Sequence, residues 1–244
     1  MDSAQAECVA DAVASAFGLG AVLGEWEPVL GGRSHRSWRL TTVRGEWIVK
    51  RLNRSREPWW LAWHGWLAES PVEIEPGFVH AVGDYLPDIA RATEIAADAA
   101  AQLGTTLDLV FTHRDVKPDN ILCTPTSPLL VDFDGAGLDV AQWEITRAAL
   151  AFARTPSGWD HDHARRILRA YRAADGYPVS ADPAAFAGLL RSRLGGASWM
   201  LFRALGHRPV TGPERAAARE HVLELLADLR GSLRRIEEWT TLLA

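Results

Sequence analysis

The chain has 244 residues, a formal net charge of −5 at pH 7, and 48% hydrophobic and 23% charged residues. This length allows one large or two small domains with a sizeable core, and the composition is ordinary for a soluble protein. The negative net charge argues against a nucleic-acid partner, which would need a basic face. Cys8 and Cys123 lack metal-ligand spacing and suit a reducing cytoplasm. No signal peptide is legible and no apolar run reaches the roughly 18 residues of a membrane span, so we expect a cytoplasmic protein without a membrane partner.

Hydrophobic periodicity and turn residues divide the chain into a short β-rich part and a longer helical part. In chain order we expect a helix over 4–17, strands in "EPVLGGRSHRSWRL" and "GEWIVKRL", a helix over 88–103, strands in "LDLVFTH" and "PLLVDFD", and helices near 141–154, 160–174, 183–205 and 212–243, the last with a break at Gly231 as one option. Residues 1–87 then form a first domain with a three-stranded sheet, and residues 88–244 form a second, mainly helical domain. The fold class that this predicts is α+β.

The stretch "VFTHRDVKPDNIL" concentrates polar residues between two apolar flanks, and "LLVDFDGAG" follows it. Phosphoryl transfer requires positioned metal ions, a group that orients the attacking hydroxyl, and cations near the phosphates. Asp115 is placed to accept the hydroxyl proton, and Lys117 can neutralise charge on the transferring group. Asn120 and Asp132 offer the oxygen ligands that Mg²⁺ prefers. The pattern therefore predicts a site for phosphoryl transfer.

The order and spacing of these residues match the protein-kinase signature, in which H-R-D-x-x-x-x-N is followed by D-F-G. His113, Arg114 and Asp115 with Asn120 agree with it, and a predicted strand separates them from Asp132. A lone His-Arg-Asp would be a weak signal, whereas the whole set in order is a strong one. The alternative is a polar turn whose Asp and Asn side chains bond to nearby backbone groups.

The stretch from about residue 105 to 155 resembles the kinase-like superfamily and, within it, the aminoglycoside phosphotransferase and choline kinase-like family. Asp134 stands where protein kinases have glycine, and "LDVAQWEITRAALAF" follows at once, without room for an activation segment. Lys117, in "DVKPDN", is instead written as in Ser/Thr kinases. The resemblance implies a protein-kinase-like fold of two lobes, with ATP and Mg²⁺ bound between them and a γ-phosphoryl group passed to a hydroxyl. It also implies that Asp134 assists Asn120 and Asp132 at the metal.

The β-rich part supplies candidates for nucleotide binding. The segment "LGGRSHRSW", with Gly31, Gly32 and Ser34, resembles the loop that covers the nucleotide, where glycines let backbone N–H groups approach phosphates. Lys50 on the third strand is the candidate for the lysine that holds the α- and β-phosphates. The alternatives are an ordinary hairpin turn and a surface lysine.

The N-terminal lobe is abbreviated relative to this family. Only 62 residues separate Lys50 from His113, where roughly 80 to 100 would hold the usual helix, strands and adenine-binding hinge. Glu57 and Glu69 are the possible partners of Lys50. Because no hinge is legible, GTP stays an alternative to ATP. The tryptophans at 59–66 are either a core face or a surface for a protein partner.

Two further patterns lie in the helical part. Asp160 or Asp162 is expected to be a helix N-cap and not, with His161 and His163, part of a metal site. Trp199, Arg203 and His207 fall on one helix face, which either lines an acceptor site for an acidic molecule or packs as an ordinary face.

We therefore expect an ATP/Mg²⁺-dependent kinase that phosphorylates a hydroxyl of a small molecule, such as an aminoglycoside-like antibiotic or another hydroxylated metabolite. One alternative is a Ser/Thr kinase of a precursor peptide that acts with a separate lyase and a partner protein. The other is an inactive kinase-like scaffold that binds another protein. Residues that recognise the acceptor converge from distant helices, so its identity stays open.

Overall fold

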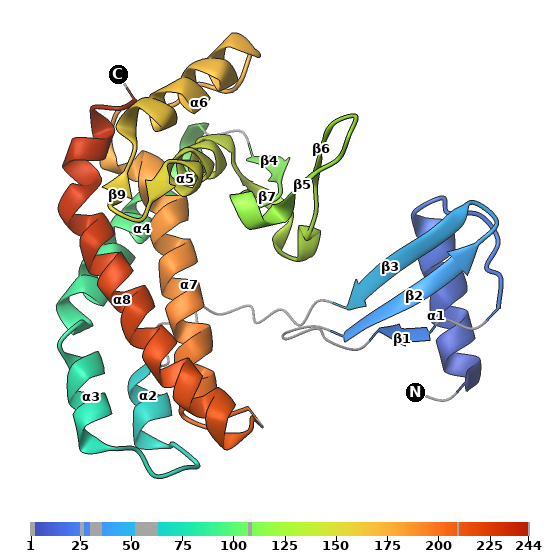
Figure 1. Ribbon diagram of the computed structural model, residues 1–244, viewed down its shortest axis with the longest axis horizontal. Coiled ribbons are helices and arrows are strands. Elements are labelled where there is room, and N and C mark those ends of the chain that lie inside the picture. The colour runs from blue at the N-terminus through green and yellow to red at the C-terminus, as the bar shows by residue number, and fades with distance from the viewer. Residues whose placement is uncertain are drawn as a thin grey trace. The chain divides into compact units, whose positions relative to one another are not determined.

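The chain forms two compact units, Met1–Arg56 (unit 1) and Glu57–Ala244 (unit 2). The computed structural model describes residues 3–24, 27–29, 36–51, 63–106, 109–208 and 210–243. Each unit is described here by itself (Figure 1). Helices and small antiparallel sheets make up the structure, so the predicted α+β class is confirmed.

Unit 1 combines one helix with a three-stranded antiparallel sheet. Its elements are α1 (Ser3–Ala16), β1 (Glu27–Val29), β2 (Arg36–Thr42) and β3 (Gly45–Arg51), with strand order β1-β2-β3. The β2–β3 hairpin brings Lys50 opposite Ser37. Leu40 of β2 is fully buried and shares a small apolar core with Ala10 and Ala14 of α1. The helix and the three strands lie where the sequence predicts them.

Unit 2 is built around α7 (Ala187–Ala204) and α8 (Gly212–Thr240), two long helices that lie side by side (Figure 1). Its helices are α2 (Trp63–Ala68), α3 (Pro76–Gly83), α4 (Leu86–Thr106), α5 (Ala141–Phe152), α6 (His161–Ala173), α7 (Ala187–Ala204) and α8 (Gly212–Thr240). Apolar residues that recur at helical spacing on α7 and α8 form the centre of the core, among them Leu190, Leu194, Leu201, Val222, Leu226 and Leu229. The core of the molecule therefore lies in this unit.

Local sequence signals set the ends of two of these helices. Asp160 is the N-cap of α6 and accepts the backbone N–H of His163 at 2.9 Å, as predicted. Thr211 and Glu214 form a capping box at the start of α8. The helix α8 then continues unbroken through Gly231, because its apolar side chains pack along α7 on both sides of this residue. The break considered at Gly231 is therefore wrong.

The strands of unit 2 come between α4 and α6. β4 (Leu109–Thr112) pairs with β7 (Gly137–Val140), and between them in sequence β5 (Ile121–Cys123) pairs with β6 (Pro128–Leu130). A smaller pair, β8 (Arg154–Thr155) with β9 (Gly158–Trp159), follows α5. Two short 3₁₀ helices lie among the first four strands, η2 (Pro118–Asn120) and η3 (Phe133–Gly135), and another, η4 (Pro183–Phe186), directly precedes α7.

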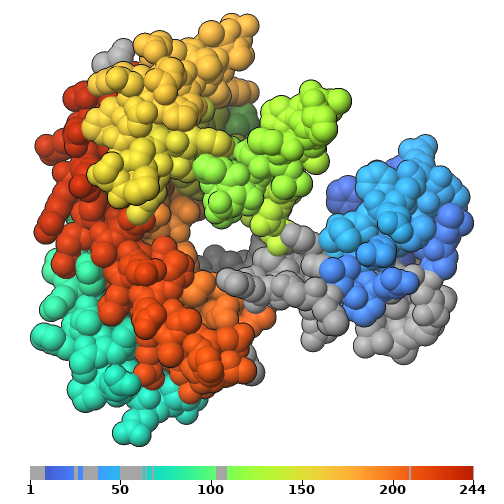
Figure 2. Space-filling model, in the orientation of Figure 1, coloured from blue at the N-terminus to red at the C-terminus, as the bar shows by residue number. Residues whose placement is uncertain are grey.

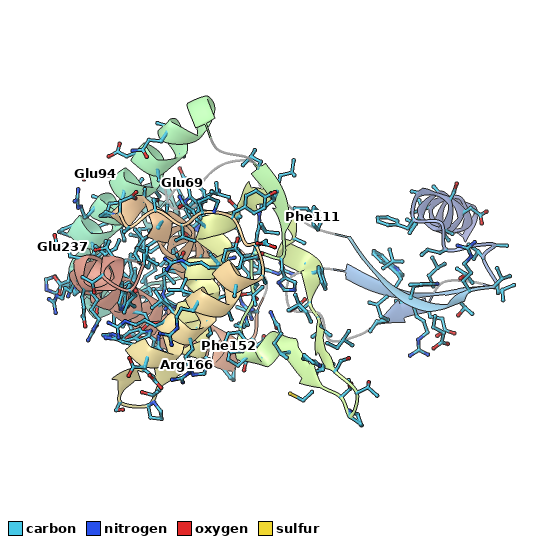
Figure 3. All side chains as sticks on the ribbon, turned by 90° about the horizontal axis from the view of Figure 1, so that it is seen from above. Glu69, Glu94, Phe111, Phe152, Arg166 and Glu237 are labelled. Atoms are coloured by element: carbon cyan, nitrogen blue, oxygen red, sulfur yellow. The ribbon has the colours of Figure 1, made fainter. Side chains whose placement is uncertain are left out.

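The β5–β6 hairpin projects from the helices of unit 2, as the ribbon and the space-filling view both show (Figures 1 and 2). On the neighbouring strand β4, the side chain of Phe111 is largely exposed. It lies on the opposite side of unit 2 from Glu94 and Glu237 (Figure 3). The segment that carries the predicted site thus lies at the rim of the helical core.

The boundary between the compact units lies earlier than the predicted domain boundary at residues 87 and 88. The helices α2 and α3 pack on the helical core, where Trp63, Phe78 and Val82 are buried. The indole of Trp63 donates a hydrogen bond of 2.7 Å to Ser198 Oγ on α7. The physical reason is that the large apolar surface of α7 and α8 offers these side chains more burial than a three-stranded sheet does.

Within the described residues, no helix is long and apolar enough to cross a membrane.

Candidate active site

The loop after β4 gathers three of the predicted residues around one carboxylate. Lys117 Nζ lies 2.8 Å from Asp115 Oδ2, and Asn120 Nδ2 donates to the same oxygen at 3.0 Å. Asn120 Nδ2 also donates to the backbone carbonyl of Asp115 at 2.8 Å. Because Pro118–Asn120 form a single 3₁₀ turn, the chain folds back and brings residue 120 beside residue 115. The sequence grouping of Asp115, Lys117 and Asn120 is therefore a spatial grouping as well.

The carboxylate of Asp115 combines access to solvent with a defined orientation. The side chains of Asp115 and Lys117 are each 41% exposed, so a solute can reach them. Asn120 is buried and therefore fixed by its surroundings. A carboxylate that is held by a charged and a neutral donor, and is still accessible, can accept a proton from a bound hydroxyl.

His113 connects this loop to the strand that carries the predicted metal ligand. It is buried, at 4% exposure, and its Nε2 lies 2.9 Å from the carbonyl oxygen of Val131. The backbone N–H of Asp115 donates to His113 Nδ1 at 3.3 Å. An N–H donor at Nδ1 and a carbonyl at Nε2 together require the neutral imidazole with its proton on Nε2. The ring packs edge to face against Phe133, with centroids 4.4 Å apart.

Asp132 follows β6 in an unusual backbone conformation. Its φ of 67° and ψ of 60° are left-handed, a region that costs a non-glycine residue roughly 1–2 kcal/mol. The side chain is exposed, and η3 with Asp134 follows directly. Such backbone strain is concentrated at functional sites, where the surrounding structure maintains it.

Asn120 and Asp132 are brought together by the β5–β6 pairing. Ile121 is opposite Leu130, and the backbone N–H of Val131 donates to the carbonyl of Asn120 at 2.9 Å. Asp132 is the next residue, so the two predicted metal ligands come from adjacent ends of paired strands. Both hydrogen bonds of the Asn120 amide nitrogen are directed at Asp115, so the carboxamide oxygen is the atom that could bind a metal ion.

Among the residues that the structure describes, no three His, Cys, Asp or Glu side chains form a group that could hold a metal ion. The predicted ligand set consists of two carboxylates, Asp132 and Asp134, and the carboxamide of Asn120. Mg²⁺ commonly uses one or two carboxylates and completes its shell with waters and substrate phosphates. The oxygen donors present therefore fit this ion.

Glu144 of α5 is a site residue that the sequence analysis missed. Its Oε2 accepts the backbone N–H of His113 at 3.3 Å, and its Oε1 accepts the backbone N–H of Arg114. Arg147, one turn further along α5, lies 3.9 Å from the same carboxylate. Burial lowers the pKa of the Arg147 guanidinium, and the carboxylates of Glu144 and Asp139 partly oppose that shift. The sequence signal for Glu144 is an acidic residue in the first turn of the helix that follows the predicted metal ligands.

The predicted nucleotide-binding residues are placed only in part. Lys50 lies on β3, and its side chain is outside the described residues. Gly31, Gly32 and Ser34 also lie outside them, as does Glu57. Glu69, the other candidate partner of Lys50, is exposed and directly follows α2. The roles of these residues stay predictions.

Aromatic side chains at the end of α7 pack on one another. The rings of Trp199 and Phe202 stack with centroids 6.3 Å apart, and His207 stacks on Phe202 at 5.1 Å. His207 Nε2 also lies 3.1 Å from the carbonyl of Trp66. Trp66 is partly buried and, with Trp63, packs on the helical core, while Trp59 lies outside the described residues. These contacts favour the packing alternative for both aromatic segments.

The loop and the residues around it match a known protein family. Residues 58–177, which include the whole loop and α5, match the model of the phosphotransferase enzyme family, APH. This segment, just under half of the chain, is similar to the APH phosphotransferase family. This match confirms the predicted enzyme class, a kinase with an alcohol group as acceptor. A comparison with curated proteins finds no match.

Three solved structures are similar to this chain at low sequence identity. A choline/ethanolamine kinase family protein from Mesorhizobium loti has 15% identity and a TM-score of 0.47, covering 95% of this chain and 97% of that one. Spectinomycin phosphotransferase APH(9)-Ia, in complex with ADP and spectinomycin, has 9% identity and a TM-score of 0.45, covering 90% and 98%. Choline kinase from Cryptosporidium parvum Iowa II has 9% identity and a TM-score of 0.34, covering 89% and 93%.

Proposed function

We propose that this protein transfers the γ-phosphoryl group of ATP to a hydroxyl of a small molecule, with Mg²⁺ as the cofactor. The observation that supports this most directly is the accessible Asp115 carboxylate, which Lys117 and Asn120 hold at 2.8 and 3.0 Å. A general base must be reachable by the hydroxyl and fixed in orientation, and Asp115 meets both conditions. The predicted metal ligand Asp132 follows the backbone partner of Asn120, so base and metal ligands belong to one site.

In this proposal Asp115 orients the acceptor hydroxyl and takes its proton. As the oxygen of the acceptor bonds to the γ-phosphorus, its O–H bond breaks and the proton passes to the Asp115 carboxylate. The bond between the γ-phosphorus and the β,γ-bridging oxygen breaks at the same centre, and ADP leaves with that electron pair. Lys117 lies beside Asp115 and neutralises negative charge on the transferring group.

Asn120 and Asp132 would hold the metal ion, with Asp134 assisting. When bound there, Mg²⁺ supplies charge that neutralises the β- and γ-phosphate oxygens. Asn120 links the two functions, since its amide nitrogen orients Asp115 while its oxygen is left for the ion. Lys50, Gly31, Gly32 and Ser34 are proposed to bind the phosphates from unit 1, with ATP favoured and GTP as the alternative.

The acceptor class proposed is a small hydroxylated molecule, either antibiotic-like or another metabolite, in the cytoplasm. The precursor-peptide kinase and the inactive scaffold gain no observation in their favour. The scaffold hypothesis places a protein partner on the tryptophans at 59–66. Trp63 is instead 2% exposed inside the core of unit 2, which removes one residue from such a surface.

The proposal is tested by incubating the chain with ATP labelled at the γ-phosphate, Mg²⁺ and a library of small hydroxylated molecules. We expect at least one labelled product, and Asp115→Asn should lower its rate by about 10²–10⁴-fold, the usual contribution of a general base. Asp119→Asn makes the same change at an exposed position of the same loop and should keep the activity. Equal rates in the wild type and Asp115→Asn would refute the proposal.

A further inference from the structure

The side chain of Arg114 lies across β7 and contacts three consecutive residues there. Its Nη2 donates to the carbonyl of Leu138, and its Nε lies 3.2 Å from Asp139 Oδ2. The guanidinium also rests on Gly137, where an added Cβ would lie only 3.2 Å from Nη1. Any residue other than glycine at position 137 would therefore displace it.

Asp139 is the fixed end of this contact. Its side chain is only 14% exposed, and its Oδ1 accepts the backbone N–H of Val140 at 3.0 Å. The same oxygen lies 3.9 Å from Arg191 Nη1 on α7. The guanidinium of Arg191 in turn lies 5.3 Å from the ring of Trp143, which is buried between α5 and α7. Asp139 is thus anchored to β7 and to the helical core.

The two ends of the pair flank the proposed chemistry. Arg114 directly precedes Asp115, and Gly137–Asp139 begin three residues after Asp134. Arg114 has a left-handed backbone, with φ of 64°, directly before the Asp115 peptide. The contact of Arg114 with β7 therefore links the loop that carries Asp115 to the segment that carries Asp132. It does so in addition to the hydrogen bonds between β4 and β7.

We propose that Arg114 and Asp139 are positioning residues that set the place of Asp115 relative to Asp132 for catalysis. This inference rests on the proposed function. Neither side chain touches the phosphates in this account; both act through the loops that they join. Displacement of a reacting group by about 1 Å can lower a rate roughly 10²-fold, so a small shift of either loop is enough to be measured.

The contacts of Arg114 depend on the shape of its guanidinium and not only on its positive charge. The planar guanidinium contacts the Leu138 carbonyl and the Asp139 carboxylate at once while it lies flat on Gly137. A lysine ammonium is a compact charge that cannot make both contacts across this width. Arg114→Lys should therefore keep the charge pair and still lose the positioning.

The test compares Asp139→Asn and Arg114→Lys with a matched control, Asp162→Asn. Asp162 also pairs with an arginine, Arg165 at 3.0 Å, but on the exposed surface of α6. We expect both test variants to lower kcat by about 10- to 100-fold and to leave KM for ATP within about twofold, since no proposed phosphate-binding or metal-binding group is removed. The control should keep both constants.

Hydrogen exchange of the segment 110–120 supplies a readout that needs no activity. Without nucleotide, Asp139→Asn and Arg114→Lys should accelerate exchange in this segment relative to wild type, and Asp162→Asn should not. If the wild type transfers no phosphoryl group to any acceptor, the proposed function fails. Hydrogen exchange of the segment 110–120 then decides by itself whether Arg114 and Asp139 position this loop. If both test variants keep wild-type exchange, or keep wild-type kcat in an active enzyme, the inference is overturned.

Discussion

The carboxylate of Glu144 accepts the backbone N–H of Arg114, so helix α5 holds the peptide that precedes Asp115. The other carboxylate oxygen accepts the N–H of His113. The backbone of Arg114 is left-handed, and these two hydrogen bonds help to maintain that conformation. One helical side chain thus shapes the base loop of the proposed kinase site.

Glu144→Gln should therefore weaken both the fold and the activity. The amide has one oxygen for two N–H donors, and its NH₂ group would face the second donor. We expect the free energy of unfolding to fall by about 1–3 kcal/mol, the cost of an unsatisfied buried donor, and kcat to fall with it. Urea denaturation and turnover at a temperature where the variant is folded measure the two effects. Glu220→Gln on the exposed face of α8 is the control, and equal behaviour of the two variants would contradict this role.

The N-cap of α6 should make stability depend on pH in the acid range. The backbone N–H of His163 donates to Asp160 and lowers the pKa of that carboxyl from its ordinary value of 3.8, with a smaller contribution from Arg166. Because the pKa is lower in the folded state, the stabilisation is complete above the ordinary value and is lost as the pH falls through the folded-state pKa.

Asp160→Asn keeps a neutral cap oxygen and removes this titration. We expect the difference in Tm between wild type and Asp160→Asn to be constant from pH 7 to about pH 5 and to shrink as the pH falls below about 4. Thermal unfolding followed by circular dichroism between pH 2.5 and 7 measures it. A difference that stays constant over this whole range would show that the cap does not titrate.

The hydrogen bond between Trp63 and Ser198 should stabilise the docking of α2 on α7. Ser198→Ala leaves a buried indole N–H without its partner, which costs about 1–3 kcal/mol. A double-mutant cycle with Trp63→Phe isolates the pair, since Ser198→Ala should cost less once the indole is gone. Additive effects of the two substitutions in urea denaturation would rule out the coupling.

Two glycines of α7 should respond in opposite directions to alanine. At Gly188 a Cβ would lie 2.6 Å from Trp143 Cβ, so Gly188→Ala overpacks the contact between α5 and α7 and should cost about 1–3 kcal/mol. At Gly195 a Cβ would meet nothing within 4 Å, and alanine should raise stability by up to about 1 kcal/mol through helix propensity. Chemical denaturation of both variants tests this, and a destabilised Gly195→Ala with a neutral Gly188→Ala would contradict the packing described.

Local signals explain which elements could be predicted from the sequence. Asp160 caps α6 because the capping bond needs only residues 160–163, and the turn at Pro118–Asn120 that returns the chain to Asp115 is local for the same reason. Glu144 and Asp139 were missed because their partner Arg114 lies 30 and 25 residues away, and the pairing of β4 with β7 brings them together. The predicted domain boundary, after residue 87, lies later than the boundary between the compact units, after Arg56. The sequence near residue 63 does not reveal this, because the burial of Trp63 depends on a helix more than 120 residues further along the chain.

The most direct test of the account is nucleotide binding measured by calorimetry, with ATP in the presence and absence of Mg²⁺. We expect binding in roughly the micromolar range, about −8 kcal/mol, that requires Mg²⁺ and is lost in Asp132→Ala but kept in Asp119→Asn. Binding by Asp132→Ala as tight as that of the wild type, or no Mg²⁺-dependent binding of ATP or GTP by the wild type, would contradict it.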